Sequence, residues 1–338
     1  MAEADWRWRP AVEADLPGIR ALFDAVKQGE RPLAHDRWRF FGRKDEPAVL
    51  IVGEDNQGIA GLNALLPTEA ILDGRRFKAC QSIDTMVHPR ARGTGLFGLL
   101  ARKAREAAAA RGIEVVYGFP NATSLPIFVK SQAFVYIDDM PRYIRPLRPS
   151  RRKPGILGSI LDGAAGLLPR GPSAANIQVT IGAPVDAELE SLVVATPPPG
   201  ECWVHRSVAE LRWRYAPEAA MGYEWLVARR DGKAFAAIAW GMRDPSWGRR
   251  ANGRAGLMEM LGHDLPALRT ALAACIERAR AAGAWRLEAI VSRDHLVPLL
   301  RRAWFLPRGT VFFDGRRCPD DAPPPATWGV VTGDFDGY

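Results

Sequence analysis

Long hydrophobic runs, clustered cysteines and a signal sequence are all missing from this sequence. Its longest apolar-leaning run, from Gly155 to Pro169, is too short to span a bilayer and contains Asp162. The N-terminal stretch "MAEADWRWRP" has no apolar core of the kind that a signal peptide needs. The four cysteines are scattered, without the spacing of a metal site or the density of a disulfide scaffold. We therefore expect a cytoplasmic protein without a metal site.

Negative charge is in deficit. The 46 basic and 38 acidic residues give a formal charge of +8 and a pI of about 9.6. Such an excess favours an anionic partner without saying which one. The basic residues are dispersed rather than gathered on one face among aromatic residues, so we expect no nucleic-acid partner. Apolar and charged contents of 47% and 25% are those of a globular protein, and 338 residues suffice for two domains.

The chain repeats one plan twice. The stretch from His35 to Leu65 is echoed by the stretch from Ala209 to Trp240. Each copy begins with a short helix that ends in Trp-Arg-aromatic and continues with a strand, a polar turn and a second strand. Trp38 and Trp213 are 175 positions apart. This internal similarity predicts two domains of the same architecture.

The repeat also relates two acids on apolar strands. The offset of 175 carries Asp84 to Glu259, whereas Gly112 and Gly283 are only 171 positions apart. The second copy is therefore four residues shorter between its acid and its glycine. The missing residues belong to an Arg/Gly loop of the first copy.

Residue periodicity predicts an α/β fold. Helices are expected over 15–27, 95–111, 123–132 and 264–281. Strands are expected near 48–53, 59–71, 76–87, 113–119, 134–144, 222–230, 234–241, 254–261, 285–291 and 304–313. The expected domains are 1–145 and 177–316, joined by a linker, 146–176, and followed by an irregular tail, 317–338.

The stretch "MVHPRARGTGLFGLL" joins an extended segment to a helix through two glycines. Gly93 and Gly95 can adopt backbone conformations that are closed to other residues and let a ligand approach the main chain. The first N–H groups of the following helix lack internal acceptors and carry partial positive charge. Arg90 and Arg92 add full charges. The pattern predicts a phosphate or pyrophosphate site, although it lacks the ending of a P-loop and the third glycine of a dinucleotide fingerprint.

The same stretch resembles the GNAT N-acyltransferase family. The acyl-CoA loop of that family, Arg/Gln-x-x-Gly-x-Gly/Ala, is matched by Arg90, Gly93 and Gly95. Its later Asn-x-x-Ala-x-x-hydrophobic-Tyr segment is matched by Asn121, Ser124, Ile127 and Phe128. The resemblance covers residues 6–145 well and 177–313 as a fold pattern. It implies two tandem GNAT-like domains, each a mixed, mostly antiparallel sheet flanked by helices.

The resemblance implies that acyl-CoA binds where strand 82–87 diverges from strand 114–119. The pantetheine amides would pair with the backbone there, and the amides of residues 91–96 would hold the pyrophosphate. The expected cofactor-binding residues are Met86, Val87, Arg90, Arg92, Gly93, Thr94, Gly95, Leu96, Asn121, Ser124 and Phe128. The second copy has "GHDLPAL" in place of the loop, so we expect one acyl-CoA per chain.

Phe128 departs from the family pattern. It stands where the family often has a tyrosine that protonates the departing thiolate, so the resemblance assigns no residue of this chain to that role. A non-catalytic protein that binds acyl-CoA therefore remains an alternative to an enzyme.

Tandem chains with the loop in the first half resemble the N-acyltransferases of surface-polysaccharide pathways. The segments "SIDTMVHPRARGTG", "FPNATSLPIFVK" and "LRWRY" carry this resemblance. It implies acyl transfer from a CoA thioester to the amine of a dTDP-, UDP- or GDP-linked amino sugar, by direct attack of the amine. A thiol-precursor glycoside, an aminoglycoside and a peptide N-terminus are the alternative acceptors.

Amide formation requires a group that takes a proton from the amine. Asp84 lies beside the expected thioester among apolar residues, where desolvation is expected to raise its pKa. Glu259, at the equivalent point of the second copy, is the second candidate. The alternative for both acids is a buried structural carboxylate. The CoA sulfur is a third acceptor for the proton.

Three further residues are candidates for substrate binding. Ser82 is placed to orient the substrate, and Arg39 and Arg214 to bind phosphate or stack on a ring. The alternative for the two arginines is packing of a helix onto a sheet. The basic and apolar stretch from Arg151 to Gly171 is favoured as an interdomain helix, with contact to an anionic membrane surface as the alternative. A homodimer is left open.

Overall fold

The computed structural model describes residues 6–27, 31–131, 134–151, 154–169, 174–198, 200–219, 221–242, 253–292, 295–318 and 323–335. They form two compact units. The N-terminal unit comprises the described residues of Met1–Asp139 and Phe312–Thr327. The C-terminal unit comprises those between Met140 and Val311 and those of Trp328–Tyr338.

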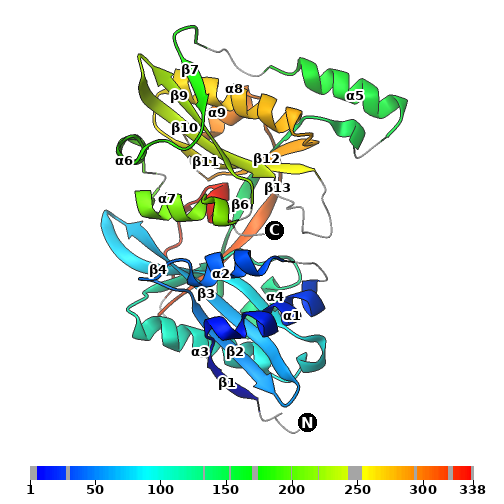
Figure 1. The fold of residues 1–338 in the computed structure, drawn as a ribbon, viewed down its shortest axis with the longest axis vertical. Helices are drawn as coiled ribbons and strands as arrows, with labels where there is room; N and C mark the ends of the chain where they lie inside the picture. The colour runs from blue at the N-terminus through cyan, green and yellow to red at the C-terminus, as the bar shows by residue number, and fades with distance from the viewer. Residues whose placement is uncertain are drawn as a thin grey trace. The chain divides into compact units, whose positions relative to one another are not determined.

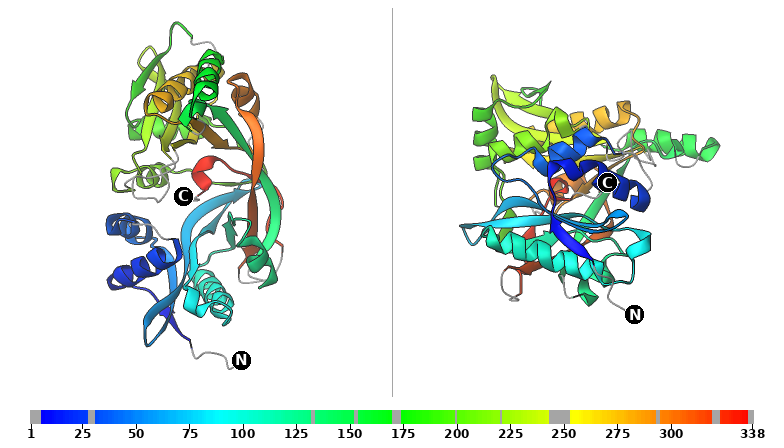
Figure 2. Two further views of the ribbon diagram at one scale, coloured as in Figure 1. Left: turned by 90° about the vertical axis from the view of Figure 1, so that its right-hand side faces the viewer. Right: turned by 60° about the horizontal axis from the view of Figure 1, so that its bottom comes forward.

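The N-terminal unit is a mixed sheet with helices on both faces (Figures 1 and 2). Its strand order is β1-β2-β3-β4-β5-β13, and only the β4–β5 pair is parallel. The strands are β1 (Arg7–Pro10), β2 (Val49–Asp55), β3 (Gly58–Leu72), β4 (Arg75–Val87), β5 (Val115–Gly118) and the end of β13 (Leu306–Arg317). Figure 2 shows α1 (Leu16–Lys27) and α2 (Leu33–Phe41) on one face and α3 (Leu96–Ala110) on the other. The short helix α4 (Leu125–Lys130) follows β5.

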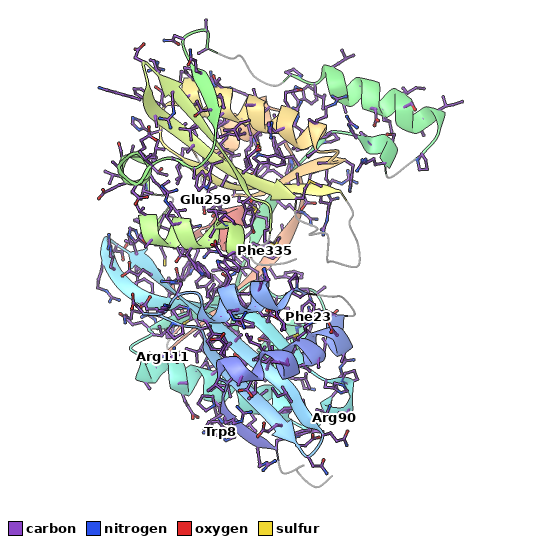
Figure 3. The ribbon with its side chains drawn as sticks, viewed as in Figure 1. Trp8, Phe23, Arg90, Arg111, Glu259 and Phe335 are labelled. Carbon is purple, nitrogen blue, oxygen red and sulfur yellow. The ribbon has the colours of Figure 1, made fainter. Side chains whose placement is uncertain are left out.

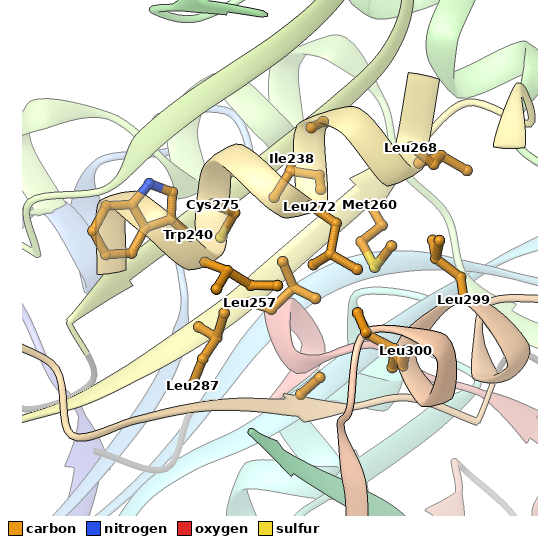
Figure 4. Close-up of a cluster of buried hydrophobic side chains, with 14 of the residues drawn as sticks. Ile238, Trp240, Leu257, Met260, Leu268, Leu272, Cys275, Leu287, Leu299 and Leu300 are labelled. Carbon is orange, nitrogen blue, oxygen red and sulfur yellow. The ribbon is translucent and has the colours of Figure 1, made fainter. Parts of the chain in front are cut away.

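The C-terminal unit has a similar sheet, in the order β6-β12-β11-β10-β9-β7. Its strands are β6 (Val135–Pro146), β7 (Gln178–Ile181), β9 (Glu224–Arg230), β10 (Lys233–Met242), β11 (Arg254–Leu261) and β12 (Arg286–Ile290), with a short pair β8 (Cys202–Val204) and β14 (Trp328–Gly329). Its helices are α5 (Ile156–Leu167), α6 (Asp186–Ala195), α7 (Val208–Arg214), α8 (Leu265–Ala281) and α9 (Val297–Arg302). The apolar stripe of α8 packs on β10 and β11, where Leu268, Leu272 and Cys275 meet Ile238 and Leu257 (Figure 4).

The repeat inferred from the sequence holds at the level of strand register. The pair Val49–Leu65 of β2 and β3 corresponds, at an offset of 175, to the observed pair Glu224–Trp240 of β9 and β10. The parallel pair Ala79–Val115 corresponds to Arg254–Arg286, with offsets of 175 and 171. Most of the helices and strands expected from periodicity are confirmed, with shifts of a few residues at their ends.

Each unit includes a strand that comes from the other half of the chain. Residues Asp314–Arg317 of β13 pair with Val115–Gly118 of β5 in the N-terminal unit. Residues Arg142–Pro146 of β6 pair with β12 in the C-terminal unit. A boundary placed by composition near residue 145 misses this exchange, because strand pairing follows hydrogen bonds between segments far apart in the sequence.

The tail after Cys318 is more ordered than its Pro-, Asp- and Gly-rich composition suggests. Residues Trp328–Asp334 contain β14 and a 3-10 turn, Thr332–Asp334, and both are buried in the C-terminal unit. Thr332 Oγ1 accepts a hydrogen bond of 2.8 Å from the N–H of Ile290, just beyond the last β11–β12 pair. The tail therefore fills the space where β11 and β12 diverge.

Candidate functional site

Strands β4 and β5 diverge as the sequence predicts. Their parallel pairing runs from Ala79–Val115 to Ser82–Gly118 and then stops. On its other side, β4 stays paired with β3 as far as Val87. Residues Ile83 to Val87 therefore have no strand partner on the β5 side within the described residues. An open backbone edge of this kind can pair with the amides of an extended ligand.

A β-bulge interrupts β4 where the two strands part. Between the pairs Leu62–Met86 and Leu65–Ser82, β4 has one residue more than β3. Asp84 lies in the bulge with a φ of +42°, a conformation that is rare for residues other than glycine. The C-terminal unit has a bulge between the corresponding pairs Ala237–Leu261 and Trp240–Leu257, beside Glu259.

The glycine loop leaves β4 through a 3-10 turn, Pro89–Ala91, and enters α3. Gly93 and Gly95 have φ angles of +79° and +84°, and a Cβ at either position would meet no atom within 4 Å. Thr94 holds the loop in place through two hydrogen bonds. Its Oγ1 accepts one of 2.8 Å from Trp6 Nε1 and donates one of 2.8 Å to the carbonyl of Ala91. The two glycines therefore present bare backbone to open space.

The N-terminus of α3 is available to an anion. The first helical hydrogen bond there runs from the N–H of Leu99 to the carbonyl of Gly95. The N–H groups of Gly95 to Gly98 find no acceptor within the part of the chain that the structure describes. Arg92 is exposed and forms no ion pair with the described residues. The loop therefore offers four amides and one guanidinium group that the described residues leave without a partner, and such groups suit a phosphate.

Arg90 takes a different position from the one expected. Its guanidinium lies 2.9 Å from Asp55 Oδ1 and donates to the carbonyl of Gly58 at 3.1 Å (Arg90 is labelled in Figure 3). It links the β2–β3 turn to the loop, and Arg92 is then the arginine of the loop that forms no ion pair with the described residues. The sequence motif does not separate the two arginines, because their roles depend on the turn beside them.

Three further residues of the expected cofactor site build the local fold. Asn121 Oδ1 accepts hydrogen bonds from the N–H groups of Thr123 and Ser124, and Ser124 Oγ accepts from the N–H of Asn121. The ring of Phe128 packs between Phe97 and Phe134, with centroid distances of 5.0 Å to each. Phe128 is therefore a core residue that joins α3 to α4.

The expected rise in the pKa of Asp84 is wrong. Its carboxylate lies 2.7 Å from Arg31 Nη1 and 3.7 Å from Arg39 Nε. Burial by itself would raise the pKa of Asp84, but the two guanidinium groups outweigh it and hold the pKa well below its usual range. A carboxylate stabilised in this way is a poor proton acceptor near neutral pH. The alternative of a buried structural carboxylate therefore fits Asp84 better than the role of a base.

Glu259 is enclosed by the tail of its own chain. Its Oε1 accepts hydrogen bonds from Arg206 Nε at 2.7 Å and from the Tyr215 hydroxyl at 3.1 Å, and its side chain is fully buried. Gly333 lies so close that a Cβ there would be 2.4 Å from the same oxygen. In Figure 3, Phe335 marks the tail beside Glu259. The tail occupies the space in which a substrate would have to lie.

The two candidate phosphate-binding arginines are also buried and paired. Arg39 contacts Asp84 in the N-terminal unit. Arg214 binds Glu210 Oε1 at 2.7 Å and the carbonyl of Gly333 at 2.7 Å in the C-terminal unit. These contacts favour the packing alternative for both arginines.

Sequence reasoning missed one carboxyl group, on the strand that crosses from the second copy. Asp314 of β13 pairs with Gly118, the residue at which β4 and β5 part. It is 1% exposed, and no described residue forms a hydrogen bond or ion pair with it. Burial without a neighbouring cation raises its pKa to about 7. The only signal in the sequence is an acid after the apolar run "VFF", and its position depends entirely on the strand exchange.

Gly118 makes room for this carboxyl group. A Cβ at Gly118 would lie 2.9 Å from Asp314 Oδ1 and 3.4 Å from the Cβ of Ser82. Ser82 and Gly118 are each two residues beyond Cys80 and Val116, which belong to the core under α3, so they face the α3 side of the sheet. Ser82, which is half-buried, and Asp314 thus lie on the two sides of Gly118 at the base of the divergence.

Comparison with known proteins agrees with this geometry. Residues 7–130 match the family model of the acetyltransferase (GNAT) domain. The N-terminal part of this chain is a GNAT acetyltransferase domain. No curated protein matches the sequence. Within the residues that the structure describes, no helix is long and apolar enough to cross a membrane, and no three potential metal ligands lie together.

Solved structures show that the GNAT fold extends over more than nine tenths of the chain. A probable N-acyltransferase from Enterococcus faecalis V583 is 11% identical with a TM-score of 0.65, over 92% of this chain and 72% of its own. N-myristoyltransferase from Saccharomyces cerevisiae with bound myristoyl-CoA is 13% identical with a TM-score of 0.66, over 93% and 83%. A fungal glucosamine N-acetyltransferase region is 14% identical with a TM-score of 0.59, over 93% and 38%.

Proposed function

We propose that this GNAT protein moves an acyl group from a CoA thioester to the amine of a nucleotide-linked amino sugar. The divergence of β4 from β5, beside an α3 N-terminus with four unbonded N–H groups, carries the proposal. The choice of acceptor is supported by the resemblance of "SIDTMVHPRARGTG" and "FPNATSLPIFVK" to amino-sugar N-acyltransferases. The similarity to a glucosamine N-acetyltransferase region supports it further.

The described residues fit acyl-CoA as the acyl donor. The open edge of β4 at Met86 and Val87 offers backbone groups to the amides of pantetheine. The N–H groups of Gly95 to Gly98 and the side chain of Arg92 suit the diphosphate. Bound acyl-CoA supplies the electrophile, a thioester carbonyl. The tail that fills the corresponding space of the C-terminal unit supports binding of one acyl-CoA per chain.

We assign the proton of the amine to the Asp314 carboxylate, which borders Gly118 at the base of the divergence. The amine nitrogen forms a bond to the acyl carbon and the carbon–sulfur bond breaks. The proton of the nitrogen passes to the Asp314 carboxylate. Sulfur leaves as a thiolate, which needs no acid, so a phenylalanine at position 128 is tolerated. Asp84 and Glu259 are held by arginines and serve this role less well.

A peptide N-terminus is the second candidate acceptor. N-myristoyltransferase from Saccharomyces cerevisiae has a similar fold, with a TM-score of 0.66 to this chain. Because acceptor pockets depend on loops rather than on the fold, the two acceptors are separated by experiment.

The proposal is tested by the release of free thiol from acyl-CoA in the presence of a panel of amines. We expect release to rise at least tenfold with a nucleotide-linked amino sugar and to stay at its background with the matched sugar that has a hydroxyl in place of the amine. The amide product is identified by mass spectrometry. Release that responds only to peptides or aminoglycosides contradicts the amino-sugar proposal. Tight acyl-CoA binding without turnover on any amine contradicts an enzymatic role.

The glycine loop provides a separate test of acyl-CoA binding. Gly93→Val places a β-branched residue at a φ of +79°, and Arg92→Glu reverses the charge beside the free amides. Each change is expected to weaken acyl-CoA binding at least tenfold, about 1.4 kcal/mol, in titration calorimetry. Gly112→Val is the matched control, because Gly112 has a φ of +77° at the opposite end of α3. Unchanged affinity in folded Gly93→Val and Arg92→Glu proteins contradicts the phosphate site.

A further inference from the structure

Helix α5 exposes its large apolar side chains. Ile156, Leu157, Ile160 and Leu167 are 83%, 63%, 63% and 86% exposed, and Leu161 adds 37%. At 100° per residue, all five lie within one face of the helix. A surface helix of a globular protein normally buries such a face. An exposed apolar stripe of this size marks an interaction surface.

The orientation of α5 is fixed by its opposite, small-residue face. Gly158 and Ala165 are buried there. Asp162 accepts hydrogen bonds from the N–H of Ser150 at 2.8 Å and from the Ser150 hydroxyl at 2.5 Å. Gly166 lies so close to Arg280 that a Cβ would be 2.9 Å from a guanidinium nitrogen. The helix is anchored by polar contacts and small side chains, which turn the apolar stripe outward.

The segment around α5 carries a large part of the net charge of the protein. Between Arg148 and Val185 the sequence has five basic residues and a single acid, Asp162. This excess of four compares with +8 for the whole chain. The lone acid is engaged by Ser150, and Arg151 is exposed at the start of the segment that leads into α5. Apolar side chains beside an excess of basic residues complement a surface that has an apolar interior and anionic groups at its boundary.

We propose that α5 binds an anionic lipid surface, with its apolar stripe at the boundary of headgroups and acyl chains and its basic flanks at the lipid phosphates. Helices with these two features lie in the plane of the interface. A second copy of the chain suits the surface less well, since a two-fold contact would bring two sets of basic flanks together. The sequence alone favours an interdomain helix here, because it does not show which face of α5 is covered.

Flotation of the full-length protein with lipid vesicles tests this proposal. We expect binding to vesicles of phosphatidylcholine with 30% phosphatidylglycerol, at least tenfold weaker binding to phosphatidylcholine alone, and loss of binding in 0.5 M salt. Leu157→Glu combined with Ile160→Glu should lower binding to the anionic vesicles at least tenfold. Both residues are exposed, so the variant is expected to keep its melting temperature and its affinity for acyl-CoA.

Val194→Glu is the matched control. Val194 is 80% exposed on α6 of the same unit and lies outside the basic segment, so its replacement should leave vesicle binding unchanged. Equal binding of the wild-type protein and the α5 variant overturns the proposal, as does absence of binding to the anionic vesicles. A wild-type dimer in light scattering that the α5 variant abolishes, without vesicle binding, assigns the stripe to a contact between copies instead.

Discussion

Asp314→Asn is expected to lower kcat/KM for acyl transfer at least a hundredfold, about 2.7 kcal/mol, the usual loss for a group that accepts a proton. The acidic limb of the pH–rate profile, with a midpoint near pH 7, should disappear in the same variant, because burial raises the pKa of Asp314 to about 7. The affinity for acyl-CoA should stay within twofold of the wild type. Steady-state kinetics between pH 5.5 and 9 and calorimetry measure these quantities.

Stability gives a readout of Asp314 that does not depend on turnover. Its pKa is raised in the folded protein from 3.8 to about 7, so folding becomes less favourable as the pH rises from about 4 to 7. Asp314→Asn removes this penalty. We therefore expect the variant to be more stable than the wild type by about 2–4 kcal/mol at pH 8, with a difference that shrinks as the pH falls toward 4. Urea unfolding at several pH values checks the trend.

Asp138→Asn is the control, since Asp138 is an exposed acid on the neighbouring strand β6. The other charged residues of β13 and of its neighbours β5 and β6 are Arg308, Arg316, Arg317, Asp138, Asp139, Arg142 and Arg145, and none of them pairs with Asp314. If Asp314→Asn keeps both the wild-type rate and the acidic limb of the profile, Asp314 takes no part in the reaction. That outcome does not contradict the proposed acyl transfer. Gly118→Ala, which places a methyl group against the carboxyl, is a second variant for the same test.

Arg206→Leu is expected to lower the free energy of unfolding of the C-terminal unit by about 3–5 kcal/mol, because it leaves two buried carboxylates without their cationic partner. Arg206 Nε lies 2.7 Å from Glu259, and its Nη2 lies 2.6 Å from Asp334 of the tail. Burial alone would lower the pKa of Arg206, but these two acids outweigh it and keep the pKa well above its usual value. The cluster ties β11 to the tail, so urea unfolding should report the loss.

Arg212→Leu is the matched control for this prediction. Arg212 pairs with Asp186 at 2.7 Å, but their side chains are 38% and 74% exposed. Such surface pairs contribute 1 kcal/mol or less. Glu259→Gln, introduced together with Arg206→Leu, should restore part of the lost stability because it removes one unpaired charge. A loss below 1 kcal/mol for Arg206→Leu would mean that the tail is held by packing alone.

Local patterns predicted much of the fold. Alternating and helical periodicities gave the strands around the site and α3, since burial of one face leaves a direct trace in the sequence. The repeat gave the equivalence of Asp84 and Glu259, and the strand registers agree with its offsets. The glycine loop was predicted down to the free amides, because positive φ angles and helix termini are local properties.

The functional groups around the loop were predicted less well. Nothing in the local sequence distinguishes Arg90, which binds Asp55, from Arg92, which faces solvent. The pKa of Asp84 depends on Arg31 and Arg39, which are more than 40 residues away. Both errors arise because charge interactions depend on distances in space, which residue spacing along the chain does not give.

The sequence by itself determined the repeated strand plan, the glycine loop with its free amides in the first copy and the absence of that loop from the second. These follow from periodicity and from backbone conformations that only glycine adopts readily. Tertiary structure alone decided that the tail closes the second copy, that Asp314 enters the first copy and that the apolar face of α5 points outward. Each of these depends on which distant segments pair or pack, and a single sequence holds no local signal for that choice.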